Sequence, residues 1–307
     1  MSAEPTEVLN TVDAALDWLA LLRDRPAPKL IVGPRGSGKT VVLRIWKSRL
    51  IQSGVPESDI LLIDAESPEV TRILSPSAFL DAVSSRLNPE RTSYVFIANA
   101  IALPNAEATL ALLFAQRRYE VIVTSSVKHI VGGMLRKYLS RSAYIAEFIP
   151  REKSYPDEVL WATWFSAVSG DVLSSGRQID LGVMNRIVQY LSDHLGDRLS
   201  LRDIASAISV DRMTVSPTTV ASYIAVLGDA YILEQVFRVS RSTAKLSKTG
   251  SLYLFLRPEL RLAKFGPAPE NEEARVTKND AWLKIRQYAT RVYVENKDGK
   301  DNFVPRK

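Results

Sequence analysis

The glycine-rich segment at residues 33–40 constrains the fold of this chain more than any other part of the sequence. It fits the pattern G-x-x-x-x-G-K-[ST] at every fixed position. A short apolar run at residues 29–32 precedes it and a helix-compatible run at residues 39–51 follows, which are the strand and helix that the pattern requires. In such a loop, backbone N–H groups and the positive end of a helix surround phosphate groups. The sequence therefore predicts a nucleoside triphosphate site made by Gly33, Pro34, Arg35, Gly36, Ser37, Gly38, Lys39 and Thr40.

Two residues of this loop have separate tasks. Lys39 is expected to neutralise charge on the β- and γ-phosphates, and the Thr40 hydroxyl is expected to ligate Mg²⁺. The guanine-reading pattern Asn-Lys-x-Asp does not occur in the sequence. ATP with Mg²⁺ is therefore the expected ligand.

Further apolar runs after the loop indicate an α/β fold. They show little polar alternation, which is typical of strands buried on both faces of a parallel sheet. Residues 29–150 are therefore predicted to form a doubly wound P-loop NTPase domain, preceded by an amphipathic helix at residues 8–22. The expected strands are 29–32, 60–63, 94–97 and 120–124, and the expected helices between them are 39–51, 77–87 and 107–116.

The pattern changes after Pro150, where it becomes mainly helical and later gives strands near residues 233–239 and 251–255. We expect a helical, winged-helix module there, followed by a short α+β tail. The predicted divisions are an N-terminal helix and linker at 1–28, a P-loop NTPase domain at 29–150, a helical, winged-helix domain at 151–250 and a tail at 251–307.

Hydrolysis requires an acidic residue at the end of a neighbouring strand, in addition to the loop. Asp64 and Glu66 end one strand, but that strand is expected at the sheet edge, away from the phosphates. The next strand ends at Asn99, which can hydrogen-bond water but cannot act as a base. Thr124 and Ser125 end the following strand, where a γ-phosphate sensor or a simple strand-terminating turn are both compatible with the sequence.

These features together resemble the prokaryotic AAA-type ATPases that carry a winged-helix module and a C-terminal nuclease-like domain of unknown function. In that family the third strand ends Asp-Glu-Ile-Gln, the sensor strand ends Thr-Gly-Ser, and an arginine follows soon after. Here Ala98-Asn99 stands where the family has its acidic pair, Ser125 replaces the glycine, and Arg141 is the matching arginine. The resemblance implies that Arg141 approaches the γ-phosphate of its own or a neighbouring subunit, although a solvated basic helix face explains it as well.

A helix-turn-helix pattern follows in the second half of the chain. Residues 200–208 and 217–233 are its expected helices, with Ser216 as the N-cap and Pro217 as the first residue of the second helix. A DNA-reading helix presents Arg, Lys, Asn or Gln to base edges, yet residues 217–233 contain no basic residue. Sequence-specific reading by this helix is therefore not expected.

Positive charge is concentrated at the C-terminal end of the chain. Residues 235–307 hold 16 Lys and Arg against 8 Asp and Glu, a net charge of +8, whereas the preceding residues hold 24 against 26. Such a surface suits non-specific contacts with nucleic-acid phosphates, and a solvated basic hairpin is the alternative. The expected phosphate contacts are Arg238, Arg241, Lys245 and Lys248.

The tail matches the nuclease-like domain of the resembled family poorly. Residues 300–304 stand where the family has Glu-Val-Asp-Phe, and the family's later Glu-Val-Lys has no counterpart before Lys307. A nuclease centre needs clustered carboxylates to hold its metal. We therefore expect the tail to be a docking surface.

Composition excludes several other classes. The sequence has no cysteine, and His129 and His194 lie far apart without a ligand cluster, which excludes disulfides and zinc sites. No apolar stretch approaches the roughly 20 residues that span a bilayer, and residues 1–10 are polar, so a cytoplasmic protein is expected.

Three functional hypotheses follow. The first is an ATP-binding AAA-type protein with weak or absent hydrolysis that acts as a nucleotide-dependent switch or scaffold. The second is a nucleic-acid-binding adaptor with a largely structural P-loop domain. The third is an active ATPase that uses Asp64 or Glu66. A homo-oligomer or a protein partner is compatible with each hypothesis.

Overall fold

The structure is a computed structural model that describes residues 7–23, 25, 27–128, 143–149, 162, 164–172, 179–210, 213–239, 250–266, 273–297 and 300–306. The chain divides into two compact units, Met1–Arg151 and Glu152–Lys307.

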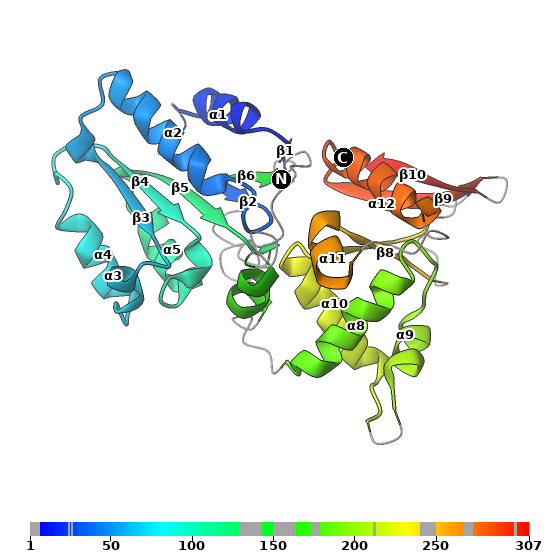
Figure 1. Cartoon of the computed structure of the whole chain (residues 1–307). Helices are drawn as coiled ribbons and strands as arrows, with labels where there is room; N and C mark the ends of the chain where they lie inside the picture. Colours follow the sequence, from blue (N-terminus) through cyan, green and yellow to red (C-terminus); the bar gives the residue numbers. More distant parts are fainter. Residues whose placement is uncertain are drawn as a thin grey trace. The chain divides into compact units, whose positions relative to one another are not determined.

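A six-stranded parallel sheet forms the centre of the first unit, as expected for the α/β class (Figure 1). The strand order is β1-β6-β2-β5-β4-β3, so the strand before the P-loop is an inner strand and β3 lies at one edge. The strands are β1 (Glu7–Leu9), β2 (Lys29–Val32), β3 (Ile60–Asp64), β4 (Ser93–Ala98), β5 (Tyr119–Ser125) and β6 (Tyr144–Phe148).

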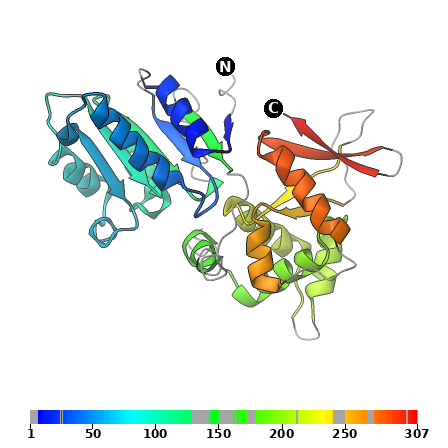
Figure 2. The ribbon, with the colours of Figure 1, turned by 45° about the horizontal axis from the view of Figure 1, so that its top comes forward.

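Helices cover both faces of this sheet because successive strand residues point to opposite sides. In β2, Ile31 packs on the side of α1 and α2, whereas Leu30 and Val32 pack on the side of α4 and α5. Figures 1 and 2 show the sheet between these two helical layers. The helices are α1 (Val12–Leu21), α2 (Lys39–Gln52), α3 (Pro68–Thr71), α4 (Pro76–Ser84) and α5 (Ala106–Phe114), with 3₁₀ turns η1 (Glu57–Asp59) and η2 (Ala100–Ala102).

The start of the chain differs from the sequence-based expectation of one helix from residue 8. Glu7–Leu9 is a strand that pairs in parallel with β6, and the helix begins only at Val12. Thr11 is its N-cap and accepts a hydrogen bond from the Ala14 N–H at 3.1 Å. Pairing with a distant strand thus overrides the local helical pattern of Val8 and Leu9.

The second unit contains helices and two antiparallel hairpins. The helix-turn-helix pair is confirmed at the level of its elements, because α9 carries a capping box at Ser200 and α10 has Ser216 as N-cap with Pro217 next. The second helix ends at Asp229, earlier than expected, and Leu233 begins a strand. The elements are η4 (Ala167–Val172, a π-helical segment), α8 (Leu181–Asp193), α9 (Leu201–Ile208), α10 (Pro217–Asp229), β7 (Leu233–Val236), β8 (Leu252–Phe255), α11 (Pro258–Phe265), α12 (Glu273–Arg286), β9 (Arg291–Lys297) and β10 (Lys300–Arg306).

Buried polar side chains of α12 connect it to the β7–β8 hairpin. Asn279 accepts a hydrogen bond from the Phe255 N–H at 2.8 Å and donates to the Phe255 carbonyl at 3.1 Å. Arg286, which is 1% exposed, donates through Nε to Glu234 at 3.0 Å. The tail is therefore integrated into the core of the second unit.

Among the described residues, no helix combines the length and the apolar character needed to cross a bilayer. The same part of the chain holds no group of three or more His, Asp or Glu side chains that could bind a metal ion.

Candidate functional site

The P-loop connects β2 to α2 at the carboxyl end of the sheet. Gly36 and Gly38 adopt φ values of 77° and 101°, which side chains with a Cβ rarely adopt. Gly38 is the N-cap of α2, so the loop leads directly into the helix N-terminus. Glycine loops of this kind can wrap backbone N–H groups around a phosphate, and the helix N-terminus adds positive partial charge.

Lys39 folds back over the loop. Its Nζ donates to the Gly33 carbonyl at 2.9 Å, to the Pro34 carbonyl at 2.7 Å and to Ser37 Oγ at 3.2 Å, and the residue is only 7% exposed. A buried ammonium group therefore lies inside the loop where phosphates would bind. Thr40 follows it as the second residue of α2 and is partly buried.

The first glycine of the loop is fixed by packing against β6. A Cβ on Gly33 would lie 2.2 Å from the Phe148 carbonyl oxygen. The Gly33 N–H also donates to the Ser125 carbonyl at 3.1 Å. The loop is thus anchored to the strands on both sides of β2.

The strand order brings the carboxyl ends of β4 and β5 together beside the loop. The Asn99 N–H donates to Thr124 Oγ1 at 3.1 Å, and Ser126 Oγ donates to Asn99 Oδ1 at 3.0 Å. Ser125 Oγ instead donates to the Val127 carbonyl at 3.2 Å. Asn99, Thr124 and Ser126 therefore form one hydrogen-bonded group. Ser125 does not join it, because its hydroxyl bonds to the backbone two residues further along.

Asn99 has two unusual properties within this group. Its φ is 53°, a left-handed conformation that Asn tolerates better than most residues. Its Nδ2 is buried and has no hydrogen-bond partner among the described residues. A buried donor without an acceptor costs about 1–3 kcal/mol, so a ligand or water at this strand end could stabilise the site by accepting from it.

Asp64 and Glu66 lie at the edge strand β3, which β4 and β5 separate from β2. Asp64 is exposed and its Oδ1 accepts a hydrogen bond from the Glu66 N–H at 3.0 Å. Glu66 forms an ion pair with Arg35 of the P-loop, with 2.9 Å between Arg35 Nη1 and Glu66 Oε1. Glu66 is therefore brought near the loop by its pairing with Arg35, whereas Asp64 makes a local turn.

Glu147 and Phe148 were not expected near the loop. Glu147 is 6% exposed, lies opposite Val32 in the sheet register, and has its Oε1 3.7 Å from Lys128 Nζ. The short apolar and aromatic run of β6, Tyr144-Ile145-Ala146 and then Phe148, is a signal from which this strand could have been identified.

Most of the other residues that the sequence predicted for a site lie outside the described part of the chain. Arg141 lies outside the described residues, as do Arg241, Lys245 and Lys248. Arg238 is described and follows β7 in the second unit, where it is partly exposed.

Comparisons with known proteins agree with this architecture. The family model described as an AAA domain matches residues 25–152, and a model described as a domain of unknown function (DUF8612) matches residues 164–255. A relative from Haemophilus influenzae, described as an uncharacterized protein, is 19% identical over 331 residues, which cover 95% of this chain and 82% of the relative.

Similar solved structures share low identity with the chain. The Aeropyrum pernix ORC1 protein, solved in complex with DNA, has a TM-score of 0.34 at 16% identity and covers 89% of this chain and 95% of its own. Caenorhabditis elegans PCH-2 has a TM-score of 0.34 at 12% identity and covers 73% of this chain and 69% of its own.

The AAA match coincides with the part of the chain that holds the parallel sheet and the P-loop. The first unit therefore carries an AAA-type P-loop ATPase domain over residues 25–152.

Proposed function

We propose that the first unit binds ATP with Mg²⁺, hydrolyses it weakly or not at all, and acts as a nucleotide-dependent switch or scaffold. The observation that supports this proposal most directly is the intact P-loop beside Asn99, whose neutral amide stands at the end of β4. The loop supplies affinity for phosphate. The carboxylate that would position Mg²⁺ or water for hydrolysis is missing at the end of β4.

The residues present suit a bound nucleotide. The Lys39 ammonium group donates hydrogen bonds to two carbonyls of the loop. The β- and γ-phosphate oxygens carry more negative charge than these carbonyls, so the group can rebind to them when a nucleotide enters. The buried Asn99 Nδ2 can donate to a phosphate oxygen or to a water beside it. Both groups stabilise negative charge, and neither removes a proton from water.

Mg²⁺ would neutralise charge on the phosphates when bound. Thr40 is the residue of this loop that would ligate it. Because β4 ends without a carboxylate, most of the remaining coordination would come from phosphate oxygens and water, which Mg²⁺ accepts readily. Weak positioning of the metal is therefore expected.

An active ATPase that uses Asp64 or Glu66 is less well supported. Glu66 is held by Arg35, and Asp64 accepts the Glu66 N–H, so both carboxylates already have partners. An Asp64→Asn variant with normal turnover would exclude Asp64 as a metal ligand.

The test is a binding measurement on the whole chain with Mg²⁺ and a fluorescent ATP analogue. Lys39→Ala should weaken binding at least tenfold. Lys47→Ala is the matched control, because Lys47 lies on the same helix and pairs with Glu57 at the surface. Equal affinity of Lys39→Ala and the wild type would refute nucleotide binding by this loop. Phosphate release measured in parallel separates a binder from an active enzyme.

A second candidate function is non-specific nucleic-acid binding by the second unit. It is supported by the 16 basic against 8 acidic residues at 235–307. Phosphate contacts release counterions, so affinity should fall steeply as salt rises. Absence of any binding to single-stranded or duplex oligonucleotides at about 50 mM salt would remove this candidate.

A further inference from the structure

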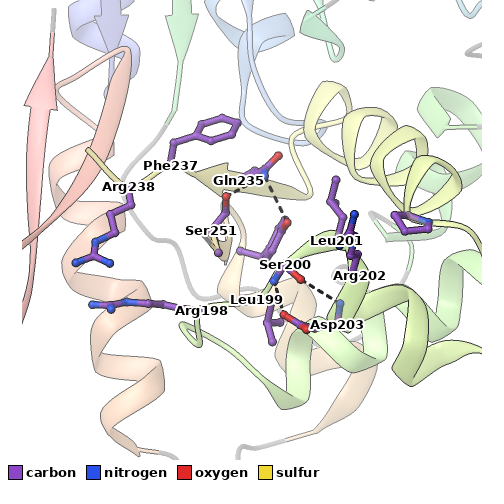
Figure 3. Close-up of a pocket in the computed structure, with 13 residues that line it drawn as sticks. Arg198, Leu199, Ser200, Leu201, Arg202, Asp203, Gln235, Phe237, Arg238 and Ser251 are labelled. Atoms are coloured by element: carbon purple, nitrogen blue, oxygen red, sulfur yellow. Dashed lines mark hydrogen bonds between the residues drawn. The ribbon is translucent and has the colours of Figure 1, made fainter. Parts of the chain in front are cut away.

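A pocket of about 810 Å³ lies in the second unit between the start of α9, the start of α10 and the β7–β8 hairpin. It is lined by residues that are distant in sequence, and three of them are arginines. Figure 3 shows Arg198 and Arg238 on one side of the pocket and Arg202 on the other. The pocket can therefore present positive charge to a ligand from two sides.

The three arginines differ in how far they are neutralised. Arg198 is paired with Asp301, which also accepts from Lys278 at 2.9 Å. The side chains of Arg202 and Arg238 make no hydrogen bond or ion pair with any residue that the structure describes. Both guanidinium groups are therefore available to an anion.

One acidic residue, Asp203, also lines the pocket. Its carboxylate accepts the Ser200 N–H at 2.8 Å in the capping box of α9. Hydrogen bonds from the Ser200 side chain and backbone lower the pKa of Asp203, so it stays ionised and bound to the helix end. The lining arginines outnumber it, and the pocket remains positive.

An aromatic ring completes the pocket. Phe237 is 40% exposed, whereas Val236 before it and Val239 after it are 1% and 3% exposed. Gln235, on β7 two residues before this ring, donates through Nε2 to Ser251 Oγ at 3.0 Å. Burial raises the pKa of Tyr253 to about 12, so its hydroxyl remains a neutral group within the lining. The pocket thus combines an accessible ring, polar groups and two guanidinium groups that pair with none of the described residues.

We propose that this pocket binds nucleotides of a single-stranded nucleic acid, with a base stacked on Phe237 and phosphates contacted by Arg202 and Arg238. This inference rests on the proposed nucleic-acid binding of the second unit and assigns it a site. Aromatic rings and positive charge along one groove are the features that hold single strands without reading their sequence.

A duplex fits these features less well. In a duplex the base faces are stacked on each other and cannot reach an aromatic ring in a pocket. Helix α10 offers Thr218, Thr219 and Ser222 but no basic side chain for a major groove. The accessible ring therefore favours unstacked bases.

The experiment measures binding of a labelled single-stranded oligonucleotide, and of the duplex of the same sequence, to the whole chain across a salt series. Arg202→Gln combined with Arg238→Gln should weaken single-strand binding and lower the slope of log affinity against log salt by about 1.4, since each phosphate contact contributes roughly 0.7. Arg186→Gln is the control for the loss of surface charge: it removes one exposed positive charge from α8 at a different cavity, where the double variant removes two, and it should leave the slope nearly unchanged.

A second variant isolates the ring. Phe237→Leu keeps an apolar side chain but removes the stacking surface, and it should weaken binding by about fivefold or more. A 2-aminopurine base in the oligonucleotide should be quenched by the wild type and by Arg186→Gln, and less by Phe237→Leu. This optical signal does not depend on charge.

The outcomes separate the two proposals. If the wild type binds neither oligonucleotide, nucleic-acid binding fails and the pocket assignment fails with it. If the wild type binds but the pocket variants behave like Arg186→Gln, only the pocket assignment is overturned. Tighter binding of the duplex would also overturn it, as would binding of a labelled acidic peptide through Arg202 and Arg238 in place of the single strand.

Discussion

Asn99 illustrates how one side chain can change the chemistry of a site without changing its shape. The residue keeps the strand end in contact with Thr124 and Ser126 through its backbone N–H and its Oδ1. Its remaining group is a donor, whereas a carboxylate at this position would present an acceptor to Mg²⁺. The same backbone can therefore hold a nucleotide while lacking a metal ligand.

Asn99→Asp is expected to raise ATP turnover. The substitution removes the buried donor and supplies a negative oxygen at the end of β4, which helps to position Mg²⁺. We expect an increase on the order of tenfold in phosphate release at saturating Mg·ATP, a modest part of the ~10²–10⁴ that positioned acid–base groups provide. Asn99→Ala is the control and should stay at the basal rate. Equal rates for both variants would show that another defect limits turnover.

Gly33→Ala is expected to destabilise the first unit because the new Cβ would meet the Phe148 carbonyl oxygen at 2.2 Å. Backbone atoms cannot move aside as a flexible side chain can, so the cost should be about 1–3 kcal/mol or more. Urea unfolding followed by circular dichroism would measure it.

A glycine that has room for a Cβ provides the comparison for that experiment. A Cβ on Gly228 of α10 would meet its nearest neighbour, the Leu233 carbonyl oxygen, at an ordinary 3.6 Å. Gly228→Ala should leave stability unchanged or raise it by roughly 0.5–1 kcal/mol, since alanine favours helices. A similar loss in both variants would contradict the packing argument.

At the scale of elements, β2 and β5 are joined by a buried ion pair as well as by backbone hydrogen bonds. Lys29 is fully buried, and its Nζ lies 2.7 Å from Glu120 Oε1 and 2.8 Å from the Arg25 carbonyl. The pair lies at the start of both strands, at the opposite end from the P-loop. It contributes to the sheet and not to the nucleotide site.

Removing one partner of this pair should cost more than removing both. Glu120→Ala leaves a buried ammonium group without its carboxylate and should destabilise the unit by about 3–5 kcal/mol. Lys29→Met combined with Glu120→Leu should be near neutral, because apolar groups of similar size avoid the desolvation cost. Thermal unfolding of the single and double variants distinguishes these cases. A double variant as unstable as the single one would contradict this account.

The elements that the sequence predicted well are those with local signals. The P-loop, Ser216 with Pro217, and the apolar run of β2 each identify themselves within a few residues. The pairing of Glu7–Leu9 with β6 depends on a partner far along the chain, so the local helical pattern was misleading. The pairing of Arg35 with Glu66 likewise depends on where β3 places its end, which no spacing in the sequence indicates.

At the scale of the whole molecule, the chain consists of two units that carry different candidate binding sites. The first, Met1–Arg151, has the sheet and the P-loop, and the second, Glu152–Lys307, has the helix-turn-helix pair and the arginine-lined pocket. The AAA and DUF8612 models match separate segments, one in each unit. A ligand of one unit should therefore act first on the stability of that unit.

Differential scanning calorimetry should show that the two units unfold in separate transitions. Mg·ATP at 100 times its dissociation constant stabilises the binding unit by about 2.7 kcal/mol. For a unit of this size that corresponds to a rise in Tm of about 5–11 °C. We expect one unfolding transition to move and the other to stay, and Lys39→Ala to remove the shift. Equal movement of both transitions in the wild type would contradict independent unfolding.

The parallel pairing of β1 with β6 has a consequence for the behaviour of the chain in solution. A three-residue strand, Glu7–Leu9, hydrogen-bonds to the side of β6 that would otherwise present a row of unpaired backbone groups. Such a row is a template for strands of other chains. Because β1 is now the edge and has only three residues, it leaves a shorter row of unpaired groups than β6 would. We therefore expect cleavage near Leu9 to favour self-association even if the P-loop is intact.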